Sequence, residues 1–157
     1  MNNIWKYSLV LAFSIILDQL IKGTSQSLIL EDGGVSPLIG DIFFTRFKNS
    51  DFVFGFSTPF LKSYQNTIAM FFSLGIIFYS LKAVVKNRNK RPLKGWAYTL
   101  IISGFFTSWL DRVSQGFTLD YLGLKFHDTM FAFSLGDIMT VLGILMITVL
   151  ETRERLL

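Results

Sequence analysis

The segment FSLGDIMTVLGILMITVL, residues 133–150, sets an acidic residue at the entrance of a long apolar run. After Asp137, the side chains from Ile138 to Leu150 are uncharged and mostly apolar. With its flanks, this run approaches the roughly 17–25 residues that a membrane-spanning helix needs. A carboxylate inside or beside a bilayer costs on the order of 2.5–3.5 kcal/mol on insertion scales. The segment therefore indicates a membrane protein in which a partner offsets the charge of Asp137 or Asp137 has a specific task.

The composition of the whole chain agrees with a membrane protein. Of its 157 residues, 51% are hydrophobic, and the mean hydropathy is +0.47, which is too apolar for an ordinary soluble domain. The absence of Cys excludes disulfides, thiol catalysis and Cys-based metal sites, and a single histidine, His127, disfavours a His-rich metal site or a Ser-His triad. We expect neither a metal nor a cofactor.

Four stretches have the length and apolar character of membrane spans. The first is interpreted as a retained helix rather than a cleaved signal peptide, because Asp18 and Lys22 follow its apolar part and no small-residue cleavage site appears. The expected fold is an all-α membrane protein with four transmembrane helices and a small extracytoplasmic β-hairpin or sheet cradle, in a single domain over residues 1–157. The helices are expected at about 4–22, 64–85, 95–112 and 135–151, with outer loops at 23–63 and 113–134.

The distribution of Lys and Arg predicts the orientation. The connection KNRNKRPLK, residues 86–94, holds five of them, whereas both outer loops are poorer in basic residues for their length. Basic loops stay on the cytoplasmic side of a membrane, so both termini are expected in the cytoplasm. The net charge of +4 then reflects topology, and no nucleic-acid partner is expected.

The two outer loops carry strand patterns. In IFFTRFKNSDFVFGF, residues 42–56, apolar residues alternate around a turn signal at 48–51, which predicts a β-hairpin. Three roles are possible for the Phe-rich face of this hairpin: it rests on the outer lipid surface, lines a groove, or only covers the helix bundle. The loop 113–134 is interpreted as a strand, a turn and amphipathic cover.

Ionisable residues gather at the outer ends of the predicted helices, where they are functional candidates that usually pair. Each also has a simpler explanation. Asp18 and Lys22, four residues apart, form a pair that marks a helix exit; Arg112 is an interfacial anchor; Asp120 is a loop acid. SLGD, residues 134–137, fits a capping box in which Asp137 only caps its helix. The group comprises Asp18, Lys22, Asp111, Arg112, Asp120 and Asp137.

The chemistry changes if Asp120 and Asp137 meet. Two carboxylates in one site share a proton, because both do not ionise easily together. One then acts as a general base on water while the other, protonated, polarises a carbonyl, as in aspartic proteases. Such a site needs no metal, Cys or Ser nucleophile, which suits this composition.

The order of short motifs resembles bacterial lipoprotein signal peptidase (signal peptidase II), a family of integral-membrane aspartic proteases, over nearly the whole chain. The resemblance is carried by five boxes: DQLIK (18–22) for D-x-x-x-K, KNSDFVFGF (48–56) for N-x-G-A-A-F, SWLDR (108–112) for N-x-x-D-R, TLDY (118–121) for V-V-D-F, and SLGD (134–137) for N-x-A-D.

The resemblance implies that Asp120 and Asp137 are the catalytic pair and that Asn49 binds the substrate backbone. It implies supporting roles for Asp18, Lys22, Ser108, Asp111, Arg112 and Ser134. The implied substrate is a prolipoprotein whose Cys carries diacylglycerol, cut just before that Cys. The implied setting is the bacterial cytoplasmic (inner) membrane, with the active site at the outer face of a monomer in contact with membrane lipids.

Several residues depart from the family boxes. Ser108 and Ser134 stand where the family has Asn, and Asp51, Phe52 and Val53 replace its Gly-Ala-Ala. The chain is therefore expected to be a divergent member. An alternative is a catalytically silent or retuned paralogue that binds a lipidated peptide or partner. A small ion-coupled transporter is disfavoured, because the acids lie at one edge and no repeat is visible.

Overall fold

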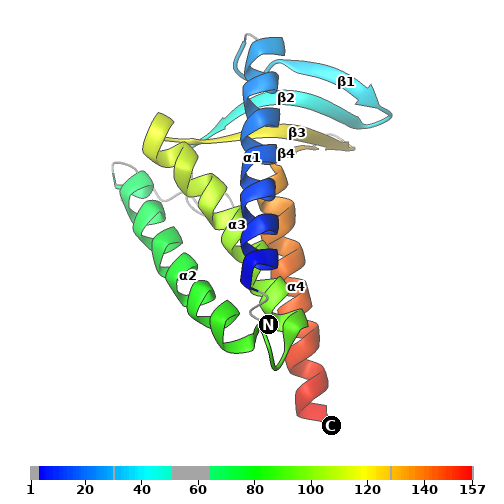
Figure 1. Cartoon of the computed structure of the whole chain (residues 1–157). Coiled ribbons are helices and arrows are strands. Elements are labelled where there is room, and N and C mark those ends of the chain that lie inside the picture. The colour runs from blue at the N-terminus through cyan, green and yellow to red at the C-terminus, as the bar shows by residue number, and fades with distance from the viewer. Residues whose placement is uncertain (1–3, 30, 51–63, 128, 157) are drawn as a thin grey trace.

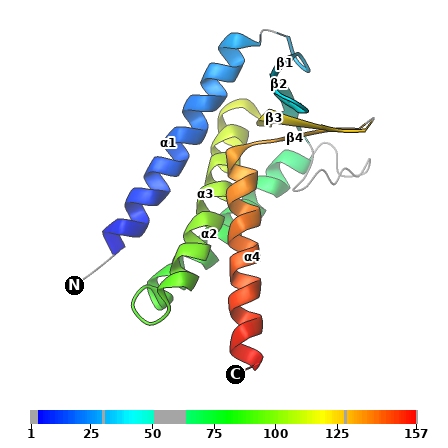
Figure 2. The ribbon, with the colours of Figure 1, turned by 90° about the vertical axis from the view of Figure 1, so that its right-hand side faces the viewer.

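The computed structural model describes residues 4–29, 31–50, 64–127 and 129–156. Four helices form a bundle with a four-stranded sheet at one end (Figure 1). Both ends of the chain and the α2–α3 connection point toward the opposite end of the bundle, as Figures 1 and 2 show. The helices are α1 (Ile4–Leu28), α2 (Gln65–Asn87), α3 (Pro92–Gln115) and α4 (Leu135–Leu156).

The predicted helices are present, and all four run past their predicted ends. α1 continues six residues beyond Lys22 to Leu28, and α2, α3 and α4 end at Asn87, Gln115 and Leu156. Among the described residues, α1, α2 and α4 are long and apolar enough to cross a membrane. Their large exposed apolar side chains, such as Phe13, Phe71 and Val149, are those expected of helices that face lipid.

α3 lies at the centre of the bundle, in contact with the other three helices. Its buried residues include a polar series four residues apart: Thr99, Ser103, Thr107 and Asp111. Thr99 and Ser103 donate hydrogen bonds to carbonyl oxygens one turn earlier, which satisfies hydroxyls that would otherwise be buried alone. Because the other helices cover α3, these polar side chains are buried in protein.

Glycines bring α3 and α4 close together. A Cβ added at Gly104 of α3 would lie 2.2 Å from the carbonyl oxygen of Gly136 of α4, and one at Gly143 would lie 2.7 Å from the carbonyl oxygen of Ala97. Small residues at helix contacts of this kind are typical of membrane bundles. This contact fixes the start of α4, and therefore Asp137, against α3.

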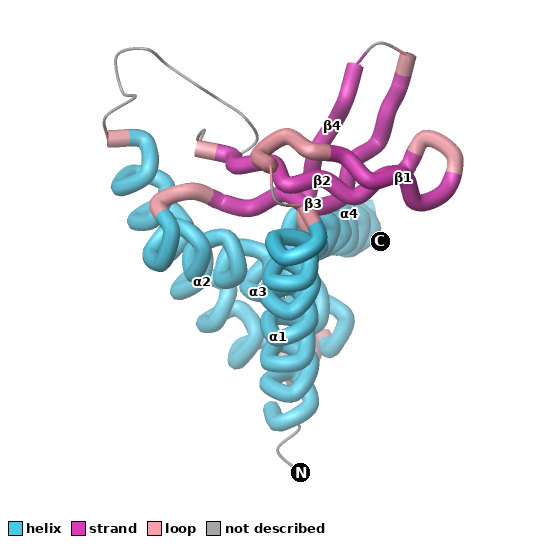
Figure 3. Tube along the Cα trace, turned by 90° about the horizontal axis from the view of Figure 1, so that it is seen from above, coloured by secondary structure: helices cyan, strands magenta, loops and turns pink. Residues whose placement is uncertain are grey.

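The sheet has the order β1-β2-β3-β4 and is antiparallel throughout. Its strands are β1 (Val35–Ile39), β2 (Ile42–Asn49), β3 (Thr118–Phe126) and β4 (Thr129–Phe133). Seen from above in Figure 3, the strands lie across the ends of the helices. The sheet thus joins the two loops that the sequence assigned to one side of the membrane.

The predicted hairpin at 42–56 is described only in its first strand. This strand, β2, pairs with the preceding strand β1 through a turn at Gly40 and Asp41, a pairing that the sequence did not predict. Gly40 has a φ of +58°, a left-handed conformation that glycine adopts without strain. On its other edge β2 pairs with β3, from Ile42 against Leu124 to Asn49 against Thr118. The predicted second strand, with Phe52, Phe54 and Phe56, and the departures at 51–53 lie outside the described residues.

Candidate active site

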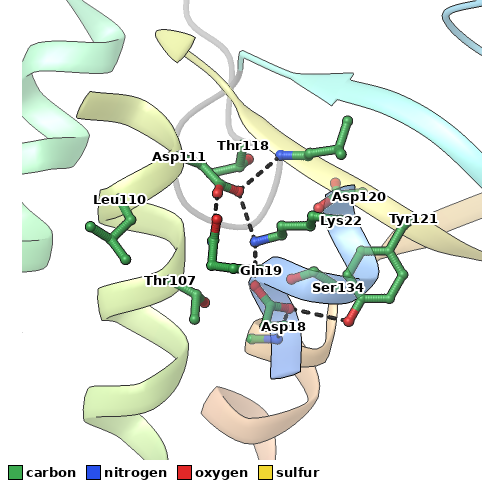
Figure 4. A network of polar contacts seen from close by, with 12 residues as sticks. Asp18, Gln19, Lys22, Thr107, Leu110, Asp111, Thr118, Asp120, Tyr121 and Ser134 are labelled. Carbon is green, nitrogen blue, oxygen red and sulfur yellow. Dashed lines mark hydrogen bonds and ion pairs between the residues drawn. The ribbon is translucent and has the colours of Figure 1, made fainter. Parts of the chain in front are cut away.

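A buried lysine joins two buried carboxylates at the sheet end of α1 and α3. Lys22 Nζ lies 2.5 Å from Asp18 Oδ2 and 2.7 Å from Asp111 Oδ2. All three side chains are 3% exposed or less. The pairing of Asp18 with Lys22 follows from their i,i+4 spacing, but the third member comes from another helix. Lys22 is therefore an internal cross-link between α1 and α3 and not only a helix exit (Figure 4).

Asp111 also holds the start of β3. Its Oδ1 accepts a hydrogen bond of 2.9 Å from Gln19 Nε2, and its Oδ2 accepts one of 3.2 Å from the backbone N–H of Leu119. Leu119 precedes Asp120 in the chain. Hydrogen bonds to a charged acceptor are stronger than neutral ones, so Asp111 fixes the backbone next to Asp120.

Tyr121, on the other side of Asp120, ties β3 to α1 and α4. Its hydroxyl donates to Asp18 Oδ1 at 3.2 Å and accepts from the backbone N–H of Leu135 at 3.0 Å. Asp18 Oδ1 also accepts from the backbone N–H of Gly136 at 3.3 Å. The phenol is buried, and burial together with the nearby negative charge of Asp18 raises the pKa of Tyr121 above its usual value. This network holds the residues beside both Asp120 and Asp137.

Asp120 itself is 4% exposed on β3. Burial, followed by the negative charge of Asp137, raises the pKa of Asp120 to about 7, and the hydrogen bond from Asn49 opposes this rise. Asn49 Nδ2 donates to Asp120 Oδ2 at 3.1 Å from the adjacent strand β2. Near neutral pH the Asp120 carboxyl is therefore balanced between its two protonation states, as a proton-transfer group requires.

Asp137 lies in the first turn of α4 and forms the predicted capping box with Ser134. Asp137 Oδ2 accepts hydrogen bonds from the Ser134 N–H at 2.7 Å and the Ser134 hydroxyl at 2.8 Å, and the Asp137 N–H donates back to Ser134 Oγ at 3.3 Å. These contacts and the helix dipole stabilise a negative charge on Asp137.

Both carboxylates nevertheless open into one space. Asp120, Asp137 and Asn49 line a cavity of about 650 Å³ between the sheet and the start of α4. The rest of its wall is mostly apolar and includes Phe43, Phe47, Val35, Met130, Phe131, Phe133 and Val141. Asp137 therefore caps α4 through Ser134 and also lines this cavity. A mostly apolar cavity with a few convergent polar groups is the usual form of a ligand-binding or active site.

One glycine shapes this cavity. Gly123 of β3 is paired with Phe43 of β2, and a Cβ at Gly123 would lie 2.0 Å from the Phe43 ring. The ring therefore rests on the bare backbone of Gly123. Without this glycine, the Phe43 side chain would have to move from its place in the cavity wall.

The two remaining predicted support residues lie away from this network. Ser108 is half-buried on α3, and its side chain forms no hydrogen bond with the described part of the chain. Arg112 is buried and donates from Nη1 to Asn66 Oδ1 at 3.3 Å, which connects α3 to α2. The described contacts thus make Arg112 a link between helices.

Sequence reasoning missed Tyr121, Gln19 and Gly123. Tyr121 lies at the end of the TLDY box, where the family pattern V-V-D-F has Phe. The additional hydroxyl was the one feature of the sequence that could have indicated a polar contact at this position. Gln19 lies inside DQLIK, but nothing in the spacing shows that it reaches Asp111. The contact of Gly123 with Phe43 depends on strand register, which the sequence does not reveal.

Comparisons with known proteins identify the family and the fold of this chain. Residues 10–152 match the family model described as Signal peptidase (SPase) II. A lipoprotein signal peptidase of Buchnera aphidicola subsp. Schizaphis graminum is 32% identical over 85 residues, which is 54% of this chain and 54% of that relative. This alignment spans about half of each protein. A lipoprotein signal peptidase of Bartonella henselae is 25% identical over 121 residues, covering 76% of this chain and 72% of the relative.

Two solved structures described as bacterial membrane enzymes share the fold. One has a TM-score of 0.85 at 18% identity, covering 97% of this chain and 90% of the other. The second has a TM-score of 0.70 at 21% identity, covering 93% and 92%. At these identities the likeness concerns the fold.

Proposed function

The chain belongs to the signal peptidase II family, and we propose that it is a membrane aspartic endopeptidase that removes signal peptides from diacylglyceryl-modified prolipoproteins, cutting before the lipidated Cys. One observation carries the aspartic assignment. Asp120 and Asp137 line the same apolar cavity, and the charge of Asp137 helps to raise the pKa of Asp120 to about 7. Two carboxyl groups that face one apolar cavity favour sharing one proton, because both do not ionise easily together.

We assign the shared proton to Asp120 and the base role to Asp137. Asp137, stabilised as an anion by Ser134 and the α4 dipole, takes a proton from water. The resulting hydroxide attacks the scissile carbonyl carbon, whose oxygen receives the proton of Asp120. When the C–N bond breaks, the proton on Asp137 passes to the leaving amine, and a hydroxyl of the intermediate returns a proton to Asp120. Protons and charge balance, and the pair is regenerated.

The cavity fits a peptide that enters from the membrane. In this proposal Asn49, which donates a hydrogen bond to Asp120, binds the substrate backbone, and the apolar wall of the cavity accepts apolar side chains or the lipidated Cys. The proposal includes α3 as a fourth membrane crossing, the sheet at the outer face of the bacterial inner membrane, cytoplasmic termini and a monomeric enzyme. The basic α2–α3 connection supports this orientation.

The departures from the family boxes motivate the alternative of a silent or retuned paralogue. Ser134 keeps a contact with Asp137 although its side chain is shorter than the family's Asn. Ser108 has lost the longer reach of an amide and forms no hydrogen bond among the described residues. The question is therefore whether a bound lipidated precursor is cut.

The test is to incubate the purified protein in detergent with a diacylglyceryl-Cys precursor and with the same precursor lacking the lipid. We expect the lipidated precursor to yield a product that begins at the Cys and the unlipidated one to remain intact. A lipidated precursor that stays bound without product would favour the silent paralogue. If it neither binds nor is cut across several precursor sequences, both assignments are wrong.

A further inference from the structure

A second cavity, of about 580 Å³, lies beside the α2–α3 connection. Figure 1 shows this connection at the end of the bundle opposite the sheet. Its walls come from α2, that connection, α3 and one residue of α4. It shares no residue with the cavity that holds Asp120 and Asp137. Any ligand here therefore has a role other than that of the peptide substrate.

The charges around this second cavity are not balanced. Arg91 and Lys94 are paired with carboxylates of α4: Lys94 Nζ lies 2.5 Å from Glu151 and 2.8 Å from Glu154, and Arg91 Nη1 lies 2.6 Å from Glu154. Three further lysines line the cavity and form no ion pair within the described ranges, namely Lys82, Lys86 and Lys90. The wall of this cavity therefore carries an excess of positive charge.

Apolar surface lies directly beside these lysines. Phe78, Leu81 and Val85 of α2 are exposed, and α2 is one of the helices long and apolar enough to span a membrane. Two tyrosines of the cavity wall, Tyr79 and Tyr98, pack edge to face with ring centroids 6.1 Å apart. Tyrosine, which has an apolar ring and a polar hydroxyl, is enriched where lipid tails meet headgroups.

We propose that this cavity binds the phosphate headgroup of an anionic glycerophospholipid, with its acyl chains along the exposed apolar face of α2. Basic cavities between membrane helices hold anionic headgroups in this way. A soluble phosphate ester would use the lysines but leave the adjacent apolar face without a partner. A role in setting membrane topology alone would require only the charge of these lysines and would not explain why they line a cavity.

The experiment compares binding of dioleoyl phosphatidylglycerol and dioleoyl phosphatidylcholine to the purified protein in neutral detergent, measured by native mass spectrometry. The test variant is Lys82→Gln/Lys86→Gln/Lys90→Gln. The matched control, Lys6→Gln/Arg153→Gln/Arg155→Gln, removes the same amount of charge near the start of α1 and the end of α4, at residues that do not line the cavity. Inorganic phosphate is the competitor that distinguishes a lipid from the free anion.

The wild type is expected to bind phosphatidylglycerol at least about tenfold more tightly than phosphatidylcholine, since lysines near the membrane surface attract anionic headgroups. The test variant should lose about tenfold in phosphatidylglycerol affinity, and the control should stay within about twofold of the wild type. Because the three lysines are exposed on the surface, their substitution should leave the fold intact. The single variants Lys82→Gln and Lys86→Gln, expected to lose about two- to threefold each, provide an independent check.

Three results would overturn the proposal. The first is an equal loss in the test and control variants, because net charge alone would then explain binding. The second is equal affinity of the wild type for the two lipids. The third is displacement of phosphatidylglycerol by inorganic phosphate at equal concentration, since the apolar face of α2 would then contribute nothing.

Discussion

The hydroxyl of Tyr121 donates a hydrogen bond of 3.2 Å to Oδ1 of Asp18, across 103 residues of sequence. Tyr121 directly follows Asp120, and the same oxygen of Asp18 accepts a hydrogen bond from the N–H of Gly136, which directly precedes Asp137. One carboxylate of α1 therefore positions the strand that carries one proposed catalytic acid and the helix that carries the other.

The substitution Tyr121→Phe tests this positioning role. It removes one donor from buried Asp18 and leaves the N–H of Leu135 without its acceptor, which should cost about 1–3 kcal/mol in the free energy of unfolding. We also expect kcat for precursor cleavage to fall more than KM rises, because the two acids lose alignment and not substrate contact.

The control for Tyr121→Phe is Tyr64→Phe, at a side chain that is 65% exposed. It should change the unfolding free energy by less than about 0.5 kcal/mol and leave kcat unchanged. Equal effects of the two substitutions on kcat would remove Tyr121 from the positioning network.

Replacing Lys22 with Met should be strongly destabilising. The substitution leaves Asp18 and Asp111 buried without their shared cation, and breaking a buried ion pair in this way costs about 3–5 kcal/mol. The measurement is equilibrium unfolding in detergent.

The matched control is Lys48→Met, which breaks a 2.6 Å pair with Asp32 in which both side chains are more than a third exposed. Exposed pairs contribute at most about 1 kcal/mol. If both lysine variants lose the same small amount, the Lys22 cross-link does not stabilise the bundle.

Gly104→Ala should loosen the contact between α3 and α4. The new Cβ would lie 2.0 Å from Thr140 Oγ1 and 2.2 Å from a backbone oxygen of Gly136, so the helices must separate at a cost of about 1–3 kcal/mol. Because this contact holds the start of α4, cleavage activity should fall as well.

At Gly75 on α2, an added Cβ meets nothing within 4 Å. Gly75→Ala should therefore stabilise the helix by about 0.5–1 kcal/mol. Thermal unfolding of both glycine variants provides the comparison, and a Gly104→Ala protein as stable as Gly75→Ala would contradict the close approach of α3 and α4.

The raised pKa of Asp120 predicts a pH dependence of stability. The pKa is about 7 in the folded protein against an ordinary value of 3.8, so the folded state holds a proton that the unfolded chain releases. The contribution of Asp120 to stability should therefore be largest below about pH 4 and decline, by an amount on the order of a few kcal/mol, as pH rises to about 7.

Unfolding measured from pH 4 to 8 in the wild type and Asp120→Asn tests this dependence, since the Asn variant should lack this part of the decline. In Asp137→Asn the pKa of Asp120, followed by carboxyl ¹³C NMR, should move down because a neighbouring negative charge is gone. An unchanged pKa would mean that the two acids are not coupled.

Part of this structure follows from the sequence by local rules. The apolar run after Asp137 predicts α4, the i,i+4 spacing predicts the Asp18–Lys22 pair, and SLGD predicts the capping box; all three are present. These features depend on residues within one helical turn of each other, and local propensity determines them.

Features that depend on tertiary pairing were not predictable in the same way. The strand β1 and its turn into β2 at Gly40 and Asp41 were not predicted, and the pairing of β2 with β3 joins residues more than 60 positions apart in the chain. Asp111 was predicted as a support residue, but its contacts with Lys22 and Leu119 depend on how α3 packs against α1 and β3.

The most direct test of the account is the rate of cleavage of a diacylglyceryl-Cys precursor by Asp120→Asn and Asp137→Asn, with Asp41→Asn of the β1–β2 turn as the matched control. Each amide keeps the shape of the side chain but removes its ability to exchange a proton, so each catalytic variant should insert normally and lose at least about a thousandfold in kcat. The control should cleave like the wild type. Normal cleavage by either Asp120→Asn or Asp137→Asn would contradict the proposal that these two carboxyl groups share one proton and carry out the hydrolysis.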